Sequence, residues 1–372
     1  MTGQQDGIGE YEHLARYSLS TSVEQQYLMG DQGYQFMWSP AAYDPDIKWE
    51  TTTTYNVGVD FGFLEDRITG NIDAYLRNTN DLLNEVKVPM GSNFGNALVT
   101  NIGSMQNKGI EFALNFIPVK TKDWHLSVGL NGTYQNTVFT KLNSVDSDDY
   151  YVAVTGISKG TGTLLSRHQV GSAPYAFYVY EQVYDRSGKP VQNAFVDRSG
   201  KDGEPDGIID DYDRYCAGDP TPDFYYGLNV KLSYKNWDFG FNGHGSLGYT
   251  VFNDFASANS TAYLDIDGAG LSNFAKTIKS TGFKAENDGK QYMSDMFIED
   301  ASFFRLDDIN LGYTFREIGN WNGSIRVAAS CQNVCVLTGF SGIDPEVNGT
   351  DGVARSFWPR PRTYSLRLNI NF

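Results

Sequence analysis

The sequence predicts an all-β fold, and more specifically a transmembrane antiparallel β-barrel. Apolar and polar residues alternate along runs of about ten residues, which is the length that a tilted strand needs to cross a bilayer. Soluble sandwich strands usually keep this alternation for about five or six residues. Short turns alternate with long loops along the 372-residue chain, and the chain ends on an alternating strand closed by the aromatic Phe372.

The composition agrees with this fold class and excludes others. Glycine and aromatic residues are abundant, with 39 Gly, 24 Tyr and 23 Phe. No apolar run approaches the roughly 18 residues of a membrane-spanning helix. A net charge of −16 argues against nucleic acid as a partner, because phosphate binding needs clustered Lys and Arg. Cys331 and Cys335 have no metal-type partners nearby and are expected to be small buried residues.

Alternation predicts each hairpin of the first part of the chain. Residues 10–22 contain a plausible first strand. A strand over residues 49–63 is followed by a tight turn and a return strand that begins at Ile68. The longest pair covers residues 107–138, where polar residues such as Glu111 alternate with a continuous apolar set. One face of each hairpin is therefore apolar and the other polar.

The same pattern predicts the strands of the second part. A hairpin begins at Phe224 and turns at residues 235–236. The strand over residues 303–315 changes phase at Asp307, which predicts a β-bulge. A turn at residues 319–320 and the final strand complete a set of about ten spanning strands, with the C-terminus on the side of the short turns.

Long loops are expected on the other side. The longest is an insertion over residues 143–221, which has a strand-like piece of its own at residues 176–184. Another loop covers about residues 253–295. Because bacterial outer-membrane barrels have short periplasmic turns and longer extracellular loops, we expect the insertion to be extracellular.

Several stretches resemble one family, the SusC/RagA type of TonB-dependent outer-membrane transporters of Bacteroidota. They are KWETT (48–52), NVGVD (56–60), TNIGSMQNKGIE (100–111), FYVYEQVY (177–184), NWDF (236–239), ASFFRL (301–306), GIDPE (342–346) and PRPRTY (359–364). The motifs span nearly the whole chain in the order of the family, which is more specific than any one of them.

The resemblance implies a fold and partners. Members of this family resemble barrels of roughly 22 strands with a plugged lumen, preceded by a signal peptide, a TonB box and a plug domain. Residues 1–372 resemble only the C-terminal barrel part, and the residues after Met1 lack the basic and apolar segments of a signal peptide. We therefore expect a piece of a longer chain in the outer membrane of a Gram-negative, Bacteroidota-like cell.

One acidic segment of the insertion matches a calcium-binding loop. Such a loop needs oxygen ligands at positions 1, 3, 5, 7, 9 and 12 and a glycine at position 6. Counted from residue 202, the ligand positions hold Asp202, Glu204, Asp206, the carbonyl of Ile208, Asp210 and Asp213. Gly207 falls on the sixth position, whereas Glu204 and Asp213 depart from the common ligands at their positions. The sequence predicts structural Ca²⁺ there, the alternative being a solvated acidic loop.

Two functions from different classes follow. By the resemblance, the full protein imports oligosaccharides, or less often peptides, with a SusD-like lipoprotein over its extracellular face and TonB acting from the periplasm. No catalytic residues are expected, and lipid of the outer membrane surrounds the strands. The alternative is a soluble all-β carbohydrate-binding or glycan-degrading protein. Aromatic residues in the loops, such as Tyr151 and Trp358, fit stacking on sugars and loop packing equally well.

Overall fold

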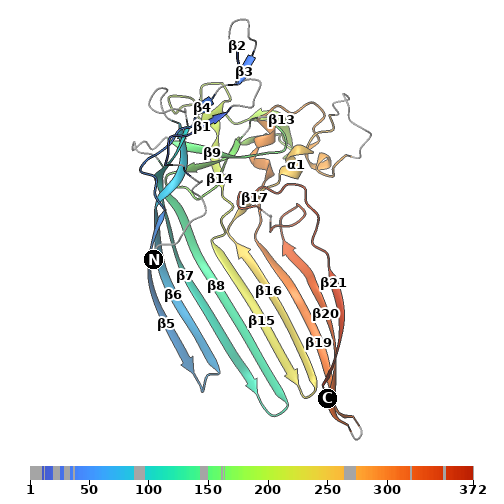
Figure 1. The fold of residues 1–372 in the computed structure, drawn as a ribbon. Coiled ribbons are helices and arrows are strands. Elements are labelled where there is room, and N and C mark those ends of the chain that lie inside the picture. Colours follow the sequence, from blue (N-terminus) through green and yellow to red (C-terminus); the bar gives the residue numbers. More distant parts are fainter. Residues whose placement is uncertain are drawn as a thin grey trace.

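The computed structural model describes residues 11, 13–19, 26–28, 34–36, 38–87, 97–142, 150–160, 162, 164–263, 274–318, 321–346 and 349–371. Phe372, the turn at residues 319–320 and the start of the long insertion, residues 143–149, lie outside these residues. The described part consists of one long curved sheet and a set of loops gathered at one end of it (Figure 1).

Nine antiparallel strands make the long sheet, in the order β21-β20-β19-β16-β15-β8-β7-β6-β5. Their bounds are β5 Thr51–Phe63, β6 Ile68–Lys87, β7 Ala97–Lys120, β8 Trp124–Lys141, β15 Phe224–Tyr234, β16 Trp237–Leu247, β19 Phe303–Ile318, β20 Trp321–Thr338 and β21 Thr363–Asn371. The all-β class and the long antiparallel strands are confirmed. Among the described residues, β5 and β21 form the two edges of the sheet.

The strand predicted within residues 10–22 is not part of this sheet. Among the described residues of this range, Tyr17–Leu19, β1, is extended, and it pairs with β4, Trp38–Pro40, in a small sheet of its own. A second small pair joins β2, Gln26–Leu28, to β3, Tyr34–Phe36. The described chain therefore has nine spanning strands where about ten were predicted, because a short alternating stretch also suits a strand within a loop.

The two ends of the sheet differ. At one end, here called the turn end, hairpins close in a few residues: Leu64, Glu65 and Asp66 have φ of 57°, 55° and 60°, and Lys235 has φ of 52°. These left-handed conformations reverse the chain tightly at some cost for residues other than glycine. At the other end, the loop end, long segments connect the strands (Figure 1). The C-terminus lies at the turn end, as predicted.

The long sheet is a single layer whose apolar face is uncovered. On the edge strands, Val57 is 75% exposed and Leu366 79% exposed, and both belong to that apolar face. A surface of this kind on a protein in water would be an aggregation hazard, whereas lipid solvates it well. Cys331 and Cys335 also belong to this face, and Cys335 is exposed, so the expectation that both are buried is wrong.

Aromatic side chains form two rows on the apolar face. Near the loop end, ring centroids of Phe112 and Phe224 lie 6.4 Å apart, and those of Tyr226 and Phe304 6.2 Å apart. Near the turn end, Trp124 and Tyr234, and Trp237 and Tyr313, lie 4.1 Å and 4.7 Å apart. Along β15 the two rows are separated by about 34 Å of strand, or about 26 Å of height at a tilt of about 40°. That height matches the apolar band of an outer-membrane barrel.

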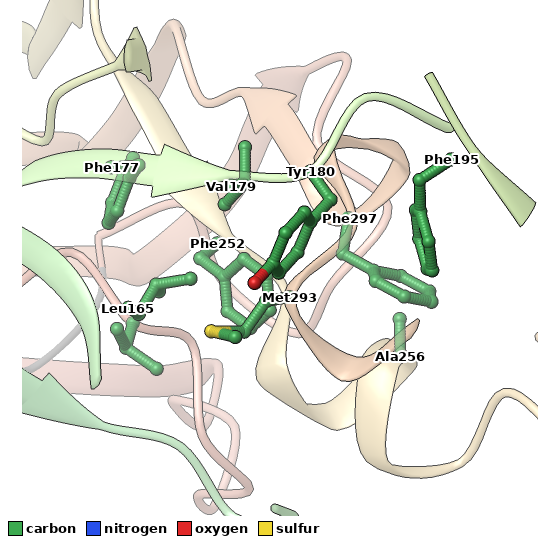
Figure 2. Packing of buried hydrophobic residues seen from close by; sticks show 10 residues of the cluster. Leu165, Phe177, Val179, Tyr180, Phe195, Phe252, Ala256, Met293 and Phe297 are labelled. Atoms are coloured by element: carbon green, nitrogen blue, oxygen red, sulfur yellow. The ribbon is translucent and has the colours of Figure 1, made fainter. Parts of the chain in front are cut away.

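The hydrophobic core lies in the loops instead of the sheet. Three segments at the loop end, residues 150–221, 248–302 and 339–362, pack together, and we call them the loop cap. Figure 2 labels core members from the first two segments, and Val353 of the third segment belongs to the same core. The buried members are Leu165, Phe177, Val179, Tyr180, Phe195, Phe252, Ala256, Met293, Phe297 and Val353.

The loop cap has short elements of its own. The segment 150–221 holds a four-stranded sheet and a hairpin, and the segment 248–302 holds two short helices and a further strand pair. The bounds are β9 Tyr151–Gly156, β10 Leu164–Gln169, β11 Ala176–Val179, β12 Gln182–Tyr184, β13 Pro190–Phe195, β14 Tyr215–Gly218, β17 Thr250–Phe252, β18 Ile298–Asp300, α1 Asp254–Ala258 and α2 Ile278–Thr281. None of the helices within the described residues is long and apolar enough to cross a membrane.

Opposite faces of one strand should respond differently to charge. Val230 lies between the two aromatic rows on the apolar face and pairs with Val128 and Phe241. Val230→Arg in the whole protein, refolded into lipid bilayers, should lower the free energy of unfolding by about 2–4 kcal/mol, the cost of Arg at the bilayer midplane. Asn229→Arg, one residue away on the polar face, is the control and should change it little. Equal losses in denaturant titrations would contradict the assignment of the faces.

Candidate functional site

A buried arginine on the polar face, Arg305 of β19, organises an ionic cluster at the loop end. Its side chain is 4% exposed, with Nη2 2.5 Å from Asp344 Oδ1 and Nε 2.7 Å from Glu346 Oε2. A third donor, Nη1, lies 2.9 Å from Asn333 Oδ1. Because a buried guanidinium is tolerated only when its donors are paired, these bonds fix the segment 339–362 against the sheet.

Two further basic side chains complete the cluster. His244 of β16 lies opposite Arg305 in the strand pairing. Its Nδ1 is 2.6 Å from Asp307 Oδ2 and its Nε2 is 3.1 Å from Glu346 Oε1. Carboxylate oxygens only accept, so two carboxylate partners favour the ring with a proton on both nitrogens, the imidazolium cation. Arg360 donates from Nη1 to Glu346 Oε2 at 2.9 Å. We call Arg305, His244, Asp307, Asp344, Glu346 and Arg360 the Arg305 network.

The network joins three stretches that the sequence marks separately, residues 301–306, 342–346 and 359–364. Their union depends on a bulge residue of β20, Asn333, which has φ of 52°. Its Oδ1 accepts from Arg305 and its Nδ2 donates to the carbonyl of Arg360 at 2.9 Å. The sequence predicted the bulge at Asp307, and the pairing with β16 confirms it, since Asn242 pairs with Asp308 and Gly243 with Leu306, which leaves Asp307 as the extra residue.

The network also changes the acidity of Glu346. Burial alone would raise the pKa of this carboxyl, but the hydrogen bond from His244 and the charges of Arg360 and Arg305 outweigh burial and lower the pKa below its usual value. The carboxylate form is therefore favoured in the folded loop.

A second polar surface lies on strands β5 to β8. Here the polar face forms a hollow of about 710 Å³. Its lining is Glu50, Thr52, Thr54, Tyr75, Arg77, Thr79, Leu82, Met105, Asn107, Glu111, Thr133, Gln135 and Thr137. Many of these groups hydrogen-bond to each other across strands: Thr52 and Thr79 Oγ1 atoms lie 3.1 Å apart, and Asn107 donates to Thr137. Hydroxyls and amides of this kind suit a hydrated lumen and neutral polar solutes.

The stretch 48–52 has a structural role at the same end. Lys48 Nζ lies 3.1 Å from a carboxylate oxygen of Asp81, a bulge residue of β6 with φ of 60°. Asn101 of β7 donates to the carbonyls of both residues at 2.7 Å. Glu50 Oε1 accepts from the backbone N–H of Leu83 at 3.0 Å. These contacts fix the entry into β5 where pairing between β6 and β7 is interrupted.

The predicted calcium loop lies on the surface of the loop cap. Asp202, Glu204 and Asp206 are exposed, as is Ile208. Asp210 caps the 3₁₀ helix Asp211–Asp213, whose last residue is fully buried. Gly207 at the sixth position has φ of 82°, which fits the sharp turn of such a loop.

The carboxylates of this loop are not gathered into a cage. Asp213 uses its oxygens to accept from the backbone N–H groups of Arg198, Ser199 and Asp210. Burial raises the pKa of Asp213, but these hydrogen bonds outweigh burial and lower it. Within the described residues, no group of three or more His, Cys, Asp or Glu side chains is placed to hold a metal ion. Ca²⁺ binding would therefore require these side chains to move.

One acid beside this loop, Asp197, is not among the residues that the sequence pattern predicts. Asp197 accepts from the N–H of Gly207 at 2.6 Å through Oδ2. Its Oδ1 is buried without a hydrogen-bond partner in the described part of the chain. The calcium-loop pattern begins at Asp202. Asp197 lies before it, separated by residues 198–201, and therefore falls on none of the ligand positions.

The fold and the polar surfaces define the class of protein: this chain is part of the wall of an outer-membrane β-barrel, with an apolar face toward lipid and a polar face toward the lumen. Residues 12–334 match a family model described as TonB dependent receptor-like, beta-barrel. The chain belongs to this family, and it lies in the outer membrane. Its relatives are receptors and not enzymes, so the soluble glycan-degrading alternative is set aside.

Individual proteins of this family are also similar to the chain along nearly its whole length. Over 382 residues the chain is 42% identical to the TonB-dependent receptor SusC of Bacteroides thetaiotaomicron, covering 100% of this chain and 37% of that protein. A TonB-dependent receptor of Formosa agariphila is 28% identical over 397 residues, covering 98% and 38% of the two chains. The structure of the RagAB peptide importer in its open-open state matches with a TM-score of 0.75 at 22% identity, which shows the shared fold. The match covers 98% of this chain and 38% of that chain. The chain thus spans less than half the length of these relatives.

The Arg305 network should hold the segment 339–362 against the sheet in a pH-dependent way. Because the pKa of Glu346 is lowered by folding, its contribution is complete above the ordinary Glu range of about 4.3 and is lost as pH falls through the lowered value. Hydrogen exchange of residues 342–360, corrected for intrinsic rates, should show protection at pH 5–7 and loss of protection once the pH falls below the ordinary range of a Glu carboxyl.

Replacing Glu346 should reproduce this loss of protection from hydrogen exchange at neutral pH. Glu346→Gln removes charged hydrogen bonds worth about 1.5–3 kcal/mol in total, so exchange should accelerate about tenfold or more. Glu65→Gln, in an exposed turn at the other end of the sheet, is the matched control. Unchanged protection in Glu346→Gln would show that the network does not hold the loop.

Proposed function

We propose that this chain forms the C-terminal barrel part of a TonB-dependent importer of oligosaccharides. The observation that carries the proposal is the 42% identity to SusC along the whole chain. The chemistry of the polar hollow on β5 to β8 supports it, since hydroxyl and amide groups outnumber charges there. Import through such a lumen needs binding and passage, and no covalent step.

We also propose two protein partners. A SusD-like lipoprotein would cover the loop cap, and TonB would act from the turn end through a part of the receptor beyond these residues. Apolar side chains on the cap support a covering partner: Phe255 is 43% exposed and Ile343 45%, and both line one hollow of the cap. Large apolar side chains at a protein surface commonly mark such an interface when they are grouped.

Uptake in cells tests the substrate class. Deletion of the receptor gene should abolish uptake of labelled neutral oligosaccharides, and the intact gene should restore it. An uncoupler of the proton-motive force should stop uptake in both strains that carry the gene, since TonB supplies the energy. Loss of peptide uptake alone on deletion would replace oligosaccharides by peptides, and unchanged uptake of both would reject the proposal.

Calcium is a separate proposal for the loop cap. We propose that Ca²⁺ orders residues 202–213 by drawing together Asp202, Glu204, Asp206, Asp210, Asp213 and the carbonyl of Ile208. The left-handed Gly207 supports it, and so does the unpartnered oxygen of the neighbouring Asp197. Hard Ca²⁺ favours several carboxylates at this spacing.

Calorimetry on the whole receptor, first stripped with a chelator, tests this proposal. Ca²⁺ should bind with a Kd of about 10⁻⁴–10⁻³ M, the range of extracellular calcium modules. Asp206→Asn should weaken binding, whereas Asp185→Asn, an exposed acid in another turn of the cap, should leave it unchanged. Absence of a Ca²⁺ heat at millimolar concentration would remove the proposal.

A further inference from the structure

A cavity of about 440 Å³ lies between the sheet, the segment 339–362 and the segment 150–221. Its floor is a row of three side chains on the polar face, Tyr225, Ser246 and Phe303. They come from neighbouring strands in register, because Ser246 of β16 pairs with Tyr225 of β15 and with Phe303 of β19. Tyr225 is 41% exposed, so its ring is open to the lumen, whereas Phe303 is 4% exposed.

The second wall is the segment that the Arg305 network holds. Pro345 and Glu346 line the cavity, and the carbonyl of Pro345 accepts from the hydroxyl of Tyr249 at 3.1 Å. Tyr249 is 9% exposed, so it braces this wall and offers little surface to a ligand. Glu346 itself is held in this wall by its bonds to His244 and Arg305.

The third wall belongs to the segment 150–221. Tyr175 lies there with φ of 60°, an uncommon and costly conformation for a bulky residue. Pro220 follows it along the wall and packs against Gly352, where an added Cβ would lie 2.2 Å from the proline ring. Close packing of these two segments makes the cavity a built feature of the loop cap.

The lining has a consistent chemistry. Among the described residues that line the cavity, Glu346 is the only carboxylate, and both of its oxygens are already bound by His244, Arg305 and Arg360. The same described lining includes no Lys, Arg or His. The remaining polar groups are hydroxyls, among them those of Ser246 and Tyr225. A neutral ligand rich in hydroxyls and with an apolar ring face satisfies this lining, whereas a charged ligand finds no free partner.

We propose that this cavity is a subsite for a pyranose unit of a neutral oligosaccharide, with Tyr225 and Tyr175 stacking against the sugar. The C–H groups of a pyranose face carry partial positive charge and fit the negative face of an aromatic ring. The inference rests on the proposed import of oligosaccharides and adds the residues that contact the cargo. Arg305 is a positioning residue, because it acts through Glu346 and does not line the cavity.

Calorimetry on the whole purified receptor tests the subsite. The probes are neutral hexasaccharides of glucose, mannose or xylose, and hexapeptides serve as the competing class. Tyr225→Ala should weaken the Kd of the sugar that binds by about tenfold or more, as expected for loss of one stacking ring. Tyr225→Phe, which keeps the ring, should stay within about threefold of the wild type.

Two further variants separate the cavity from general damage. Tyr175→Asn removes the other ring, and Asn tolerates the left-handed backbone, so sugar binding should weaken while the fold is kept. Lys231→Ala lies on the same face of β15, about 20 Å of strand toward the turn end, and should change nothing. Equal sugar affinity in wild type, Tyr225→Ala and Tyr175→Asn would overturn the subsite.

The outcomes also separate this inference from the function on which it rests. Uptake of oligosaccharides that depends on the receptor gene, together with unchanged binding by Tyr225→Ala, would retain import and reject this cavity. Binding of hexapeptides but of no hexasaccharide would reject the sugar and the oligosaccharide function together.

Discussion

A strand inside lipid must pair every backbone N–H and C=O with neighbouring strands, because no water is present to bond them. In this chain that constraint gives long, nearly unbroken registers in the nine-stranded sheet. Two of the breaks occur near the loop end, at Asp81 of β6 and Asn333 of β20, both in left-handed conformations. Each supplies polar groups that anchor a segment: Asp81 binds Lys48, and Asn333 binds Arg305 and Arg360. The interruptions of pairing therefore serve to attach the loops.

The same constraint explains where the core lies. A single-layer wall has lipid on one face and lumen on the other, so it needs no interior of its own. The long loops leave the bilayer and have to fold in water, where apolar burial drives packing. They do so jointly, since Phe177, Phe252 and Val353 come from three different loops and meet in one core. Buried Gln291 adds specificity to this packing, because its amide binds the side chain of Gln182 across the two larger segments.

Periodicity could predict the sheet because apolar and polar residues alternate within each strand, and this alternation alone shows that the strand has one apolar and one polar face. The bulge at Asp307 was predictable for the same reason, as a local change of phase. Alternation could not tell that Tyr17–Leu19 pairs outside the sheet, because three alternating residues fit either place. Nor could it bring Arg305, Asp344 and Arg360 together, although all three lie in motifs that the sequence marks, since long-range contacts leave no periodic signal. Tyr175 and Tyr225 stood out even less, because their common cavity exists only after three segments have packed.

The segment 339–362 connects the sheet, the cavity and the core of the loop cap. At one side its Glu346 is bound to His244 and Arg305 of the wall, and at the other its Val353 is buried in the core of the loop cap. A movement of the cap relative to the wall must therefore either carry this segment along or break charge-assisted bonds, which are stronger than neutral ones. Since the segment also forms one wall of the cavity, the same residues join the wall of the barrel, the cavity and the core of the loop cap.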